Sequence, residues 1–362
     1  MFRSAFVALV LASTIFAGPM KRSSGLTVDV TGPTGPVSDV NQLKFKATVK
    51  NTGSEDVKIL KYGTILDSSL PTRSFAVTKD GEDVQFTGIK LQVSLDKPDD
   101  SSFVSIPAGQ SVTVDHDVTD LFDFASAGTG TFRFEPVTSF YVTSSSNDKL
   151  SSLAQFERVQ VSSDAVEVNV TDQLEKREMA KRATNTCNDP AKKAFIDAAH
   201  FEGQALAAAA AKYINDNRQN SLFRSYFKNN DPAAVENKLT LAATENDPNR
   251  TLDCNDPYNY CASHPNVIAF TVIADTNIFF CPIFFDEVPQ NDLCTGATSV
   301  SERNIRGGTA LHELTHAVSS TIDVSYGCGD DQDLYADDQL VNADNYNCFA
   351  TQVWQDTQCF RA

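Results

Sequence analysis

The first 186 residues of this 362-residue chain contain no cysteine. Hydrophobic packing alone must therefore stabilise that part of the fold. All eight cysteines follow, and no two of them are spaced as C-x-x-C, which argues against a cysteine-bound metal. In an exported chain an even number of cysteines instead indicates disulfides, and eight cysteines predict four of them.

Basic residues are scarce as well: 30 Lys and Arg stand against 47 Asp and Glu, for a net charge of −17. From Ala183 onward there are 24 acidic residues and only 11 basic ones. This imbalance argues against nucleic-acid binding and favours basic substrates. The same acidity would also serve simply to keep an exported protein soluble, and composition does not separate the two interpretations.

Long apolar runs are missing after the N-terminus, so we expect no membrane-spanning helix and no membrane partner. The chain opens with MFRSAFVALVLASTIFAG, in which one arginine precedes an apolar run of about a dozen residues. That run is too short to span a bilayer and is typical of a signal peptide cleaved near Ala17. We therefore predict a secreted, extracellular protein.

Residues 23 to about 170 alternate like β-strands, with clusters of Gly, Pro, Asn, Asp and Ser between the strands. Short strands at such regular spacing favour an all-β, sandwich-like region. The expected strands are 26–32, 43–51, 57–66, 73–81, 84–95, 111–120, 130–142 and 165–172.

A polar linker with two dibasic pairs, Lys176-Arg177 and Lys181-Arg182, follows the strands. In an exported chain, between a cysteine-free part and a cysteine-rich part, such pairs indicate removal of a propeptide by a dibasic processing protease. Cleavage after Arg182 gives three parts: a signal peptide (1–18), a β-rich propeptide (19–182) and a mature domain (183–362). Cleavage after Arg177 is the alternative.

The mature part has a different pattern. Strong helix formers predict helices over 190–216, 220–229, 231–246, 308–319 and 344–356, and Asp231 followed by Pro232 marks one helix start. Apolar runs predict strands over 267–275 and 277–285, and Pro282 indicates that the second is an edge or bulged strand. We predict an α+β, zincin-like domain, mostly helical with a small antiparallel sheet.

The segment H-E-L-T-H carries the chemistry. On a helix, His312 and His316 are one turn apart and present both imidazoles on one face. Glu313 lies beside them and can reach a water held by a metal between the rings. A catalytic zinc takes three protein ligands and leaves one position for water, so a third ligand is needed.

The residue types missing after His316 reduce the number of candidates for the third ligand. No histidine follows His316, no glutamate follows Glu313, and a cysteine ligand would leave an odd number for disulfides. The remaining aspartates are Asp323, Asp330, Asp331, Asp333, Asp337, Asp338, Asp344 and Asp356. Asp323 is the best candidate, because the serines and threonine before it can end the helix and turn the chain back. The cluster from Asp330 to Asp338 is typical of solvated surface or of a calcium-like patch.

H-E-L-T-H followed by D-V-S-Y-G resembles the deuterolysin family of fungal zinc metalloendopeptidases, the aspzincins. The resemblance covers the whole precursor, although Ser319-Ser320 replace the Gly-Thr of the family signature. It implies that Asp323 is the third zinc ligand and that Tyr326 stabilises the oxyanion. It also implies the disulfide pairs Cys187–Cys254, Cys261–Cys281 and Cys294–Cys359, and by difference Cys328–Cys348.

N-A-D at 342–344 also matches the family. In its lysine-preferring members this aspartate and an acid three residues later receive the substrate lysine. Here the later residue is Asn347, which argues against a strict lysine preference. Asp344 has two further possible roles, as a partner that orients a ligand histidine and as an ordinary helix cap. The sequence leaves these roles open.

We therefore expect a monomeric secreted endopeptidase with one Zn²⁺ per mature domain, metal ligands His312, His316 and Asp323, and catalytic residues Glu313 and Tyr326. Its partners would be protein or peptide substrates, its own propeptide and the processing protease. We expect the strand over 277–285 to pair with the extended substrate. The alternatives are a secreted, non-catalytic binding protein with a structural zinc and a zinc hydrolase for another substrate class. His200 and His264 are expected to be structural or surface residues.

Overall fold

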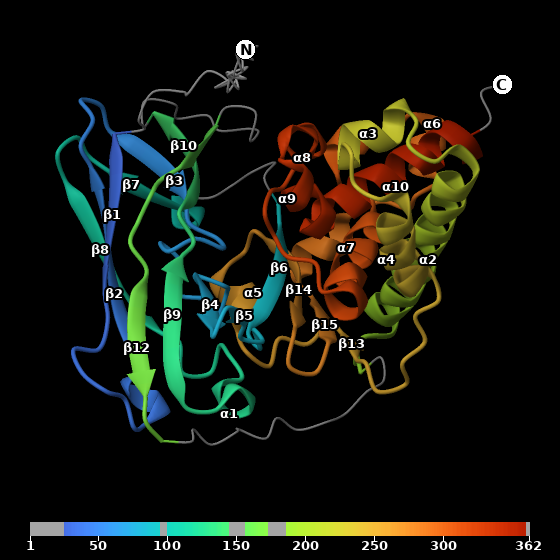
Figure 1. The fold of residues 1–362 in the computed structure, drawn as a ribbon. Helices are drawn as coiled ribbons and strands as arrows, with labels where there is room; N and C mark the ends of the chain where they lie inside the picture. Colours follow the sequence, from blue (N-terminus) through green and yellow to red (C-terminus); the bar gives the residue numbers. More distant parts are fainter. Residues whose placement is uncertain (1–24, 95–99, 145–155, 173–185, 360–362) are drawn as a thin grey trace, which may run out of the picture.

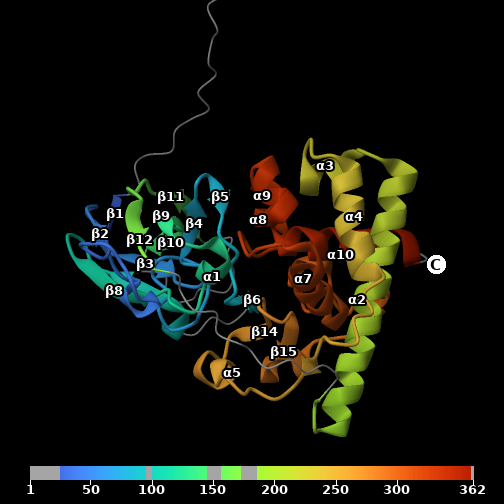
Figure 2. The same cartoon turned by 60° about the horizontal axis from the view of Figure 1, so that its bottom comes forward.

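The computed structural model describes residues 25–94, 100–144, 156–172 and 186–359. The expected signal peptide and both dibasic pairs lie outside these residues. Residues 25–172 form mainly strands and residues 186–359 mainly helices, and we call them the N-terminal and C-terminal regions. In both views the two regions lie side by side with β6, β14 and β15 between them (Figures 1 and 2).

Three antiparallel sheets make up most of the N-terminal region (Figure 1). The first contains, in order, β1 (Leu26–Thr31), β2 (Lys44–Asn51) and β8 (Ser111–Asp117). The second contains β11 (Glu157–Gln160), β10 (Ser139–Ser144), β3 (Val57–Leu60) and β7 (Phe103–Ile106). The third contains β12 (Val166–Val170), β9 (Gly130–Pro136), β4 (Phe75–Lys79) and β5 (Glu82–Asp83), and the short helix α1 (Phe124–Ala127) precedes β9.

Strand β2 shows how these sheets hold together. Its residues alternate between exposed lysines and the buried Phe45, Ala47 and Val49. The ring of Phe45 lies 5.1 Å from that of Phe75 on β4 and 4.5 Å from that of Phe134 on β9. The first and third sheets thus pack face to face around a core of apolar side chains, and within the described residues no cysteine takes part.

The C-terminal region is built from helices and a small sheet, and the long helices lie on the side of the sheet away from the N-terminal region (Figure 1). The helices are α2 (Pro190–Asn217), α3 (Ser221–Phe227), α4 (Pro232–Ala243), α5 (Tyr260–Ser263), α6 (Asp292–Thr295), α7 (Arg306–Ser319), α8 (Cys328–Asp333), α9 (Ala336–Val341) and α10 (Ala343–Gln358). Asp231 caps α4 through a hydrogen bond to the N–H of Ala233, and Pro232 is its first residue, as predicted. None of the described helices has the length and apolar character needed to cross a membrane.

The sheet between the regions differs from the expected one. Its order is β13 (Leu252–Asp253), β15 (Asn277–Phe280), β14 (Val267–Val272) and β6 (Ile89–Val93), and β13 pairs with β15 in parallel. The prediction that 277–285 is an edge or bulged strand was wrong, because β15 is paired on both sides and its register with β14 has no shift. Pro282 begins the 3₁₀ helix η4 (Pro282–Asp286) instead. Within the C-terminal region the two edges of the sheet are β13 and β14, and β6 from the N-terminal region covers β14.

Helix α7 is buried on nearly all sides, in contact with α2, α4, α10, β14 and β6. Its backbone approaches α2 closely at Gly203, where a Cβ atom would lie 3.0 Å from both Gly307 O and Leu311 N. Because these two atoms belong to the backbone, they cannot move aside like the end of a flexible side chain. The glycine therefore sets how close α7 lies to the longest helix.

The four disulfides are Cys187–Cys254, Cys261–Cys281, Cys294–Cys359 and Cys328–Cys348. These are the pairs implied by the resemblance, so that prediction is confirmed. Cys328–Cys348 joins the start of α8 to α10, and both helices flank the loop that follows α7. No described cysteine is free.

The two remaining histidines of the C-terminal region have structural partners. His200 Nε2 on α2 lies 3.1 Å from Glu245 Oε2, just after α4, and Glu245 also pairs with Arg250. His264 Nε2 lies 3.0 Å from Ser69 Oγ in the N-terminal region. Each histidine thus joins separate parts of the fold.

Replacing Gly203 with Ala should destabilise the C-terminal region by about 1–3 kcal/mol, because the added methyl group pushes α2 and α7 apart. Thermal unfolding of the full chain would measure this. Gly329→Ala is a matched control, because a Cβ atom there meets nothing within 4 Å. Equal unfolding temperatures for the two variants would contradict a close approach at Gly203.

Glu245→Gln should lower stability at pH 7 by about 2 kcal/mol, because Arg250 then loses a charged partner. Burial acts to raise the pKa of Glu245, but the hydrogen bond from His200 and the charge of Arg250 lower it below its ordinary value. The stabilisation is therefore complete above the ordinary pKa of 4.5 and is lost as the pH falls through the lowered folded value. Unfolding curves between pH 7 and 2 should show the wild type and variant converging at low pH, and a constant gap would contradict this.

Candidate metal centre

Two histidines on α7 form the base of the site. His312 and His316 are one helical turn apart, and their ring centroids lie 4.7 Å apart with perpendicular planes. Both Nε2 atoms point to the same place and are 3.1 Å apart. Both side chains are buried, so the surrounding protein atoms fix the positions of the imidazole rings.

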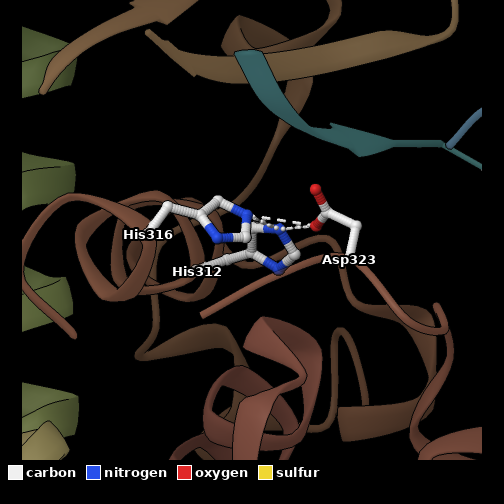
Figure 3. A group of neighbouring side chains, drawn as sticks. All are labelled: His312, His316 and Asp323. Atoms are coloured by element: carbon white, nitrogen blue, oxygen red, sulfur yellow. Dashed lines mark hydrogen bonds and ion pairs between the residues drawn. The ribbon is translucent and has the colours of Figure 1, made fainter. Parts of the chain in front are cut away.

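Asp323 reaches the same point from the loop after α7 (Figure 3). The helix ends at Ser319, and Ser320 after it has a left-handed φ of 55° and donates its N–H to Thr315 O. This turn sends the chain back towards the histidines. Asp323 Oδ1 then lies 3.0 Å from His312 Nε2 and 3.1 Å from His316 Nε2.

These three atoms suit a tetrahedral metal ion such as Zn²⁺. Ligand atoms at zinc–ligand distances of 2.0–2.1 Å are about 3.3 Å apart in tetrahedral geometry, close to the separations of 3.0 to 3.1 Å found here. Two imidazole nitrogens and one carboxylate oxygen are also a donor set that zinc prefers. A zinc ion held by these three atoms would keep a fourth position for water or substrate.

The other nitrogen of each ring has its own partner. His316 Nδ1 lies 3.0 Å from the carbonyl oxygen of Thr321, and His312 Nδ1 lies 3.3 Å from Asp344 Oδ1. When Nδ1–H donates to such an acceptor, the lone pair of Nε2 is directed at the metal position. The Asp344 carboxylate thus contacts His312, one of the expected metal ligands, and the N-cap position of α10 belongs to Asn342.

Asp344 is itself held by a buried cation. Arg303 Nε lies 2.7 Å from Asp344 Oδ2, and Arg303 Nη2 donates to Oδ1 at 2.8 Å. The N–H of Gly327 also donates to Oδ2, at 2.8 Å. Sequence reasoning missed Arg303, because it lies in a loop of no recognisable pattern and meets Asp344 only in the fold.

Asn342 fixes the loop that carries Asp323. Its Oδ1 accepts the N–H groups of Val324 and Ser325, at 2.9 and 3.1 Å. Its Nδ2 donates to Asp331 Oδ1 at 3.0 Å. A residue in the position of a helix cap thus uses its side chain to hold the ligand loop, and α10 positions both Asp323 and His312.

Glu313 lies on α7 between the two histidines and is completely buried. Thr271 on β14 donates to its Oε2 at 2.6 Å, a contact that sequence reasoning also missed. Its Oε1 has no hydrogen-bond partner among the described residues. Burial raises the pKa of Glu313 to about 8, against the opposing effects of His312 and Thr271. The carboxylate is therefore a strong proton acceptor.

The charges of the site favour a cation. Burial acts to raise the pKa of Asp323, but the two histidines hold it well below its ordinary value, so the carboxylate stays charged. Burial lowers the pKa of His316 to about 4. Burial acts in the same direction on His312, but hydrogen bonds to Asp323 and Asp344 raise its pKa to about 10. Metal binding would replace the proton on His312.

Tyr326 completes the site. Its ring lies 6.3 Å from that of His312, nearly parallel to it. Burial, the first cause, raises the pKa of its hydroxyl well above the ordinary value, so the group remains an O–H donor. That hydroxyl donates to the carbonyl oxygen of Leu91 on β6, at 2.7 Å. The donor thus faces a peptide carbonyl beside the metal position.

Comparison with known proteins relates the whole chain to one family. The profile of the Deuterolysin metalloprotease (M35) family matches residues 1–359. The chain is 28% identical to "Neutral protease 2" of Aspergillus oryzae, over 95% of this chain and 96% of the relative. It is 27% identical to "Penicillolysin" of Penicillium citrinum, again over 95% and 96%. A solved "zinc peptidase from Grifola frondosa" aligns with 16% identity and a TM-score of 0.36, over 45% of this chain and 96% of that one.

The chain belongs to the deuterolysin metalloprotease family. It is therefore a metalloendopeptidase, and the predicted membership is confirmed. The deuterolysin signature has Gly-Thr where this chain has Ser319-Ser320, and the structure shows how serine serves there. Ser319 Oγ donates to Lys238 O on α4, while Ser320 adopts the left-handed conformation that ends the helix.

Asp344 lacks the surroundings of a substrate-binding residue. It is fully buried, and both of its oxygens are taken by His312, Arg303 and Gly327. Asn347, three residues later, is also buried. The lysine-receiving role described for some deuterolysins is thus closed to Asp344 in this chain.

The expectation of a solvated acidic cluster from Asp330 to Asp338 was wrong for Asp331. This residue is buried and bonded to Asn342. Burial and the nearby charge of Asp344 raise its pKa well above its ordinary value. Asp331, Asp344 and Cys348 also lie close enough to hold a metal, but Cys348 is in a disulfide and Asp344 is engaged.

Asp344→Asn should weaken zinc binding roughly 10- to 100-fold, because His312 loses the carboxylate that orients its ring. Competition with a chelator of known affinity would measure this. Glu313→Gln is the matched control, since it changes a neighbouring carboxylate outside the proposed ligand set and should leave zinc affinity unchanged. An unaltered affinity in Asp344→Asn would show that the contact with His312 does not support the metal.

Proposed function

We propose that this deuterolysin-family chain is the precursor of a secreted, zinc-dependent endopeptidase with Glu313 as the general base. The observation that carries the proposal is the meeting of two imidazole nitrogens and one carboxylate oxygen within 3.1 Å, beside the buried Glu313. His312, His316 and Asp323 would hold one Zn²⁺. When bound, zinc supplies Lewis-acid activation of a water molecule and of the peptide carbonyl.

Glu313 performs the proton transfers in this proposal. It accepts a proton from the attacking water and delivers it to the leaving amine. Thr271 holds Oε2 of the carboxylate, and Oε1, which has no hydrogen-bond partner among the described residues, would accept the proton. A raised pKa suits both steps, because the group must bind the proton and release it within one turnover.

Tyr326 is the proposed oxyanion donor. Burial keeps its hydroxyl protonated, and the ring is packed beside His312. A fixed O–H donor at the position where negative charge develops stabilises the transition state more than the ground state. The existing bond from Tyr326 to the carbonyl of Leu91 supports this role, since a substrate carbonyl has the same chemistry.

The precursor organisation is also part of the proposal. Residues 1–18 direct export, residues 19–182 cover the active site and assist folding, and residues 183–362 are the mature monomeric enzyme. The dibasic pairs supply the cleavage site. Cysteines confined to the mature part and paired there fit an oxidising, extracellular location.

Family membership decides among the functions left open by the sequence. A non-catalytic binding protein and a hydrolase of other substrates are set aside, because the family consists of metalloproteases.

The preference for basic proteins is proposed from the acidic mature part, with 24 acidic and 11 basic residues. Comparing cleavage of histone and casein by the processed protein, at low and high salt, tests this preference.

Glu313→Gln should lower peptide hydrolysis by about 10²- to 10⁴-fold, because the base is lost. The variant should keep its zinc, as measured by metal analysis of the processed protein. Wild-type activity on casein should disappear with a chelator and return with Zn²⁺. Full activity in the variant, or activity that survives complete metal removal, would reject the mechanism.

A further inference from the structure

Strand β6 belongs to the N-terminal region but forms the edge of the C-terminal sheet. It pairs antiparallel with β14, with Leu91 opposite Phe270 and Lys90 opposite Thr271. In Figure 3 the teal β6 ribbon passes next to Asp323. No other strand of the N-terminal region joins this sheet within the described residues.

On its other side β6 is bonded to the loop that carries the metal ligand. The N–H of Leu91 donates to Asp323 Oδ2 at 3.0 Å, and its carbonyl accepts the hydroxyl of Tyr326. The ammonium group of Lys90 donates to Thr321 O at 2.6 Å. β6 thus lies in a slot between β14 and residues 321–327. Its backbone is hydrogen-bonded to Asp323 and Tyr326, two residues with proposed roles at the metal centre.

We propose that the N-terminal region inhibits the enzyme through β6, which lies in the slot of an extended substrate, and that it stays bound as a separate chain after the dibasic junction is cut. This inference rests on the proposed function. Leu91 is far from Arg182 in the sequence. Cleavage after Arg182 therefore breaks none of the hydrogen bonds that β6 makes with β14 and with residues 321–327. Activation then requires a second event, the dissociation or destruction of the N-terminal region.

The contact between the regions extends well beyond β6. One apolar cluster contains side chains of both regions. The N-terminal region contributes Leu60, Tyr62, Ile89, Leu91, Val93, Phe103 and Tyr141, and the C-terminal region contributes Val267, Phe270, Val272, Phe279 and Tyr326. All of these side chains are buried. Burial of apolar area does not depend on a covalent link, so the cluster holds the two chains together after cleavage.

Polar bonds around the cluster fix its register. Asn266 Nδ2 donates to Ser102 Oγ at 2.7 Å, and Tyr141 bonds to Ser325 in the ligand loop. The N–H of Ser94 donates to Asn266 O at 2.8 Å, just beyond the end of β6. These bonds hold β6 at one position along β14, with Leu91 beside Asp323.

The first experiment cuts the full chain at the dibasic junction and isolates the nicked complex without denaturation. The two chains should elute together in gel filtration, with activity on a fluorogenic peptide at least tenfold below that of the separated C-terminal chain. Separate elution, or full activity in an intact nicked complex, would overturn the proposal.

Two proline variants locate the inhibition. Leu91→Pro removes the N–H group that donates a hydrogen bond to Asp323. This variant should raise the activity of the nicked complex at least tenfold. Val114→Pro is the control, because it damages β8, which within the described residues is an edge strand paired with β2. In Figure 1 this strand lies on the side of the N-terminal region away from α7. Equal activation by both variants, or by neither, would show that β6 is not the inhibitory element.

A peptide supplied separately covers the case in which Leu91→Pro disturbs folding. Synthetic residues 84–94 should inhibit the activated variant, and the same peptide with proline at position 91 should not. Absence of any difference between the peptides would overturn the role of Leu91. If the separated C-terminal chain is itself inactive with zinc, the proposed function fails, while co-elution and hydrogen exchange at 89–93 still test the binding of β6.

Discussion

The negative charge of Asp323 lies between two imidazoles and needs hydrogen-bond and charge partners there. Several elements of the fold supply these partners. The charge of Asp323 meets His312 and His316 on α7 and the N–H of Leu91 on β6. Asn342 at the start of α10 holds its loop, and Asp344 on the same helix holds His312. Each of these elements supplies part of the balance, because a charge held away from water is costly in free energy unless it is paired. At Gly203 the backbones of α2 and α7, the helix that carries both histidines, lie in close contact.

Much of the centre could be predicted because its signals are local. A spacing of four residues places His312 and His316 on one helical face, and the missing downstream histidine and glutamate direct attention to aspartate. The helix over 308–319 was placed within two residues of its true start at Arg306. Asp231 and Pro232 marked another helix start, since capping chemistry is a property of adjacent residues. The disulfide pairs came from the family resemblance, as spacing alone allows too many pairings.

What the sequence could not show depends on contacts between distant residues. Arg303 has no motif, and its partner Asp344 lies 41 residues away. Asp331 looked like surface because its neighbours are acidic, but tertiary packing buries it. The segment 277–285 appeared to be an edge strand because of Pro282, yet the strand simply stops before the proline. Most of all, alternation identified 84–95 as a strand without indicating that its partner would be β14, in the other region.

The distribution of sulfur has a consequence for the fate of the two regions. Every cross-link lies in the C-terminal region, and residues 1–186 contain no cysteine at all. Once locally opened, the N-terminal strands have no covalent tie to limit their extension, so a surrounding peptidase can digest them from within. In the C-terminal region four disulfides limit the same extension. The two regions therefore differ in how far a local opening exposes the backbone to cleavage, and this difference is set by cross-linking rather than by recognition.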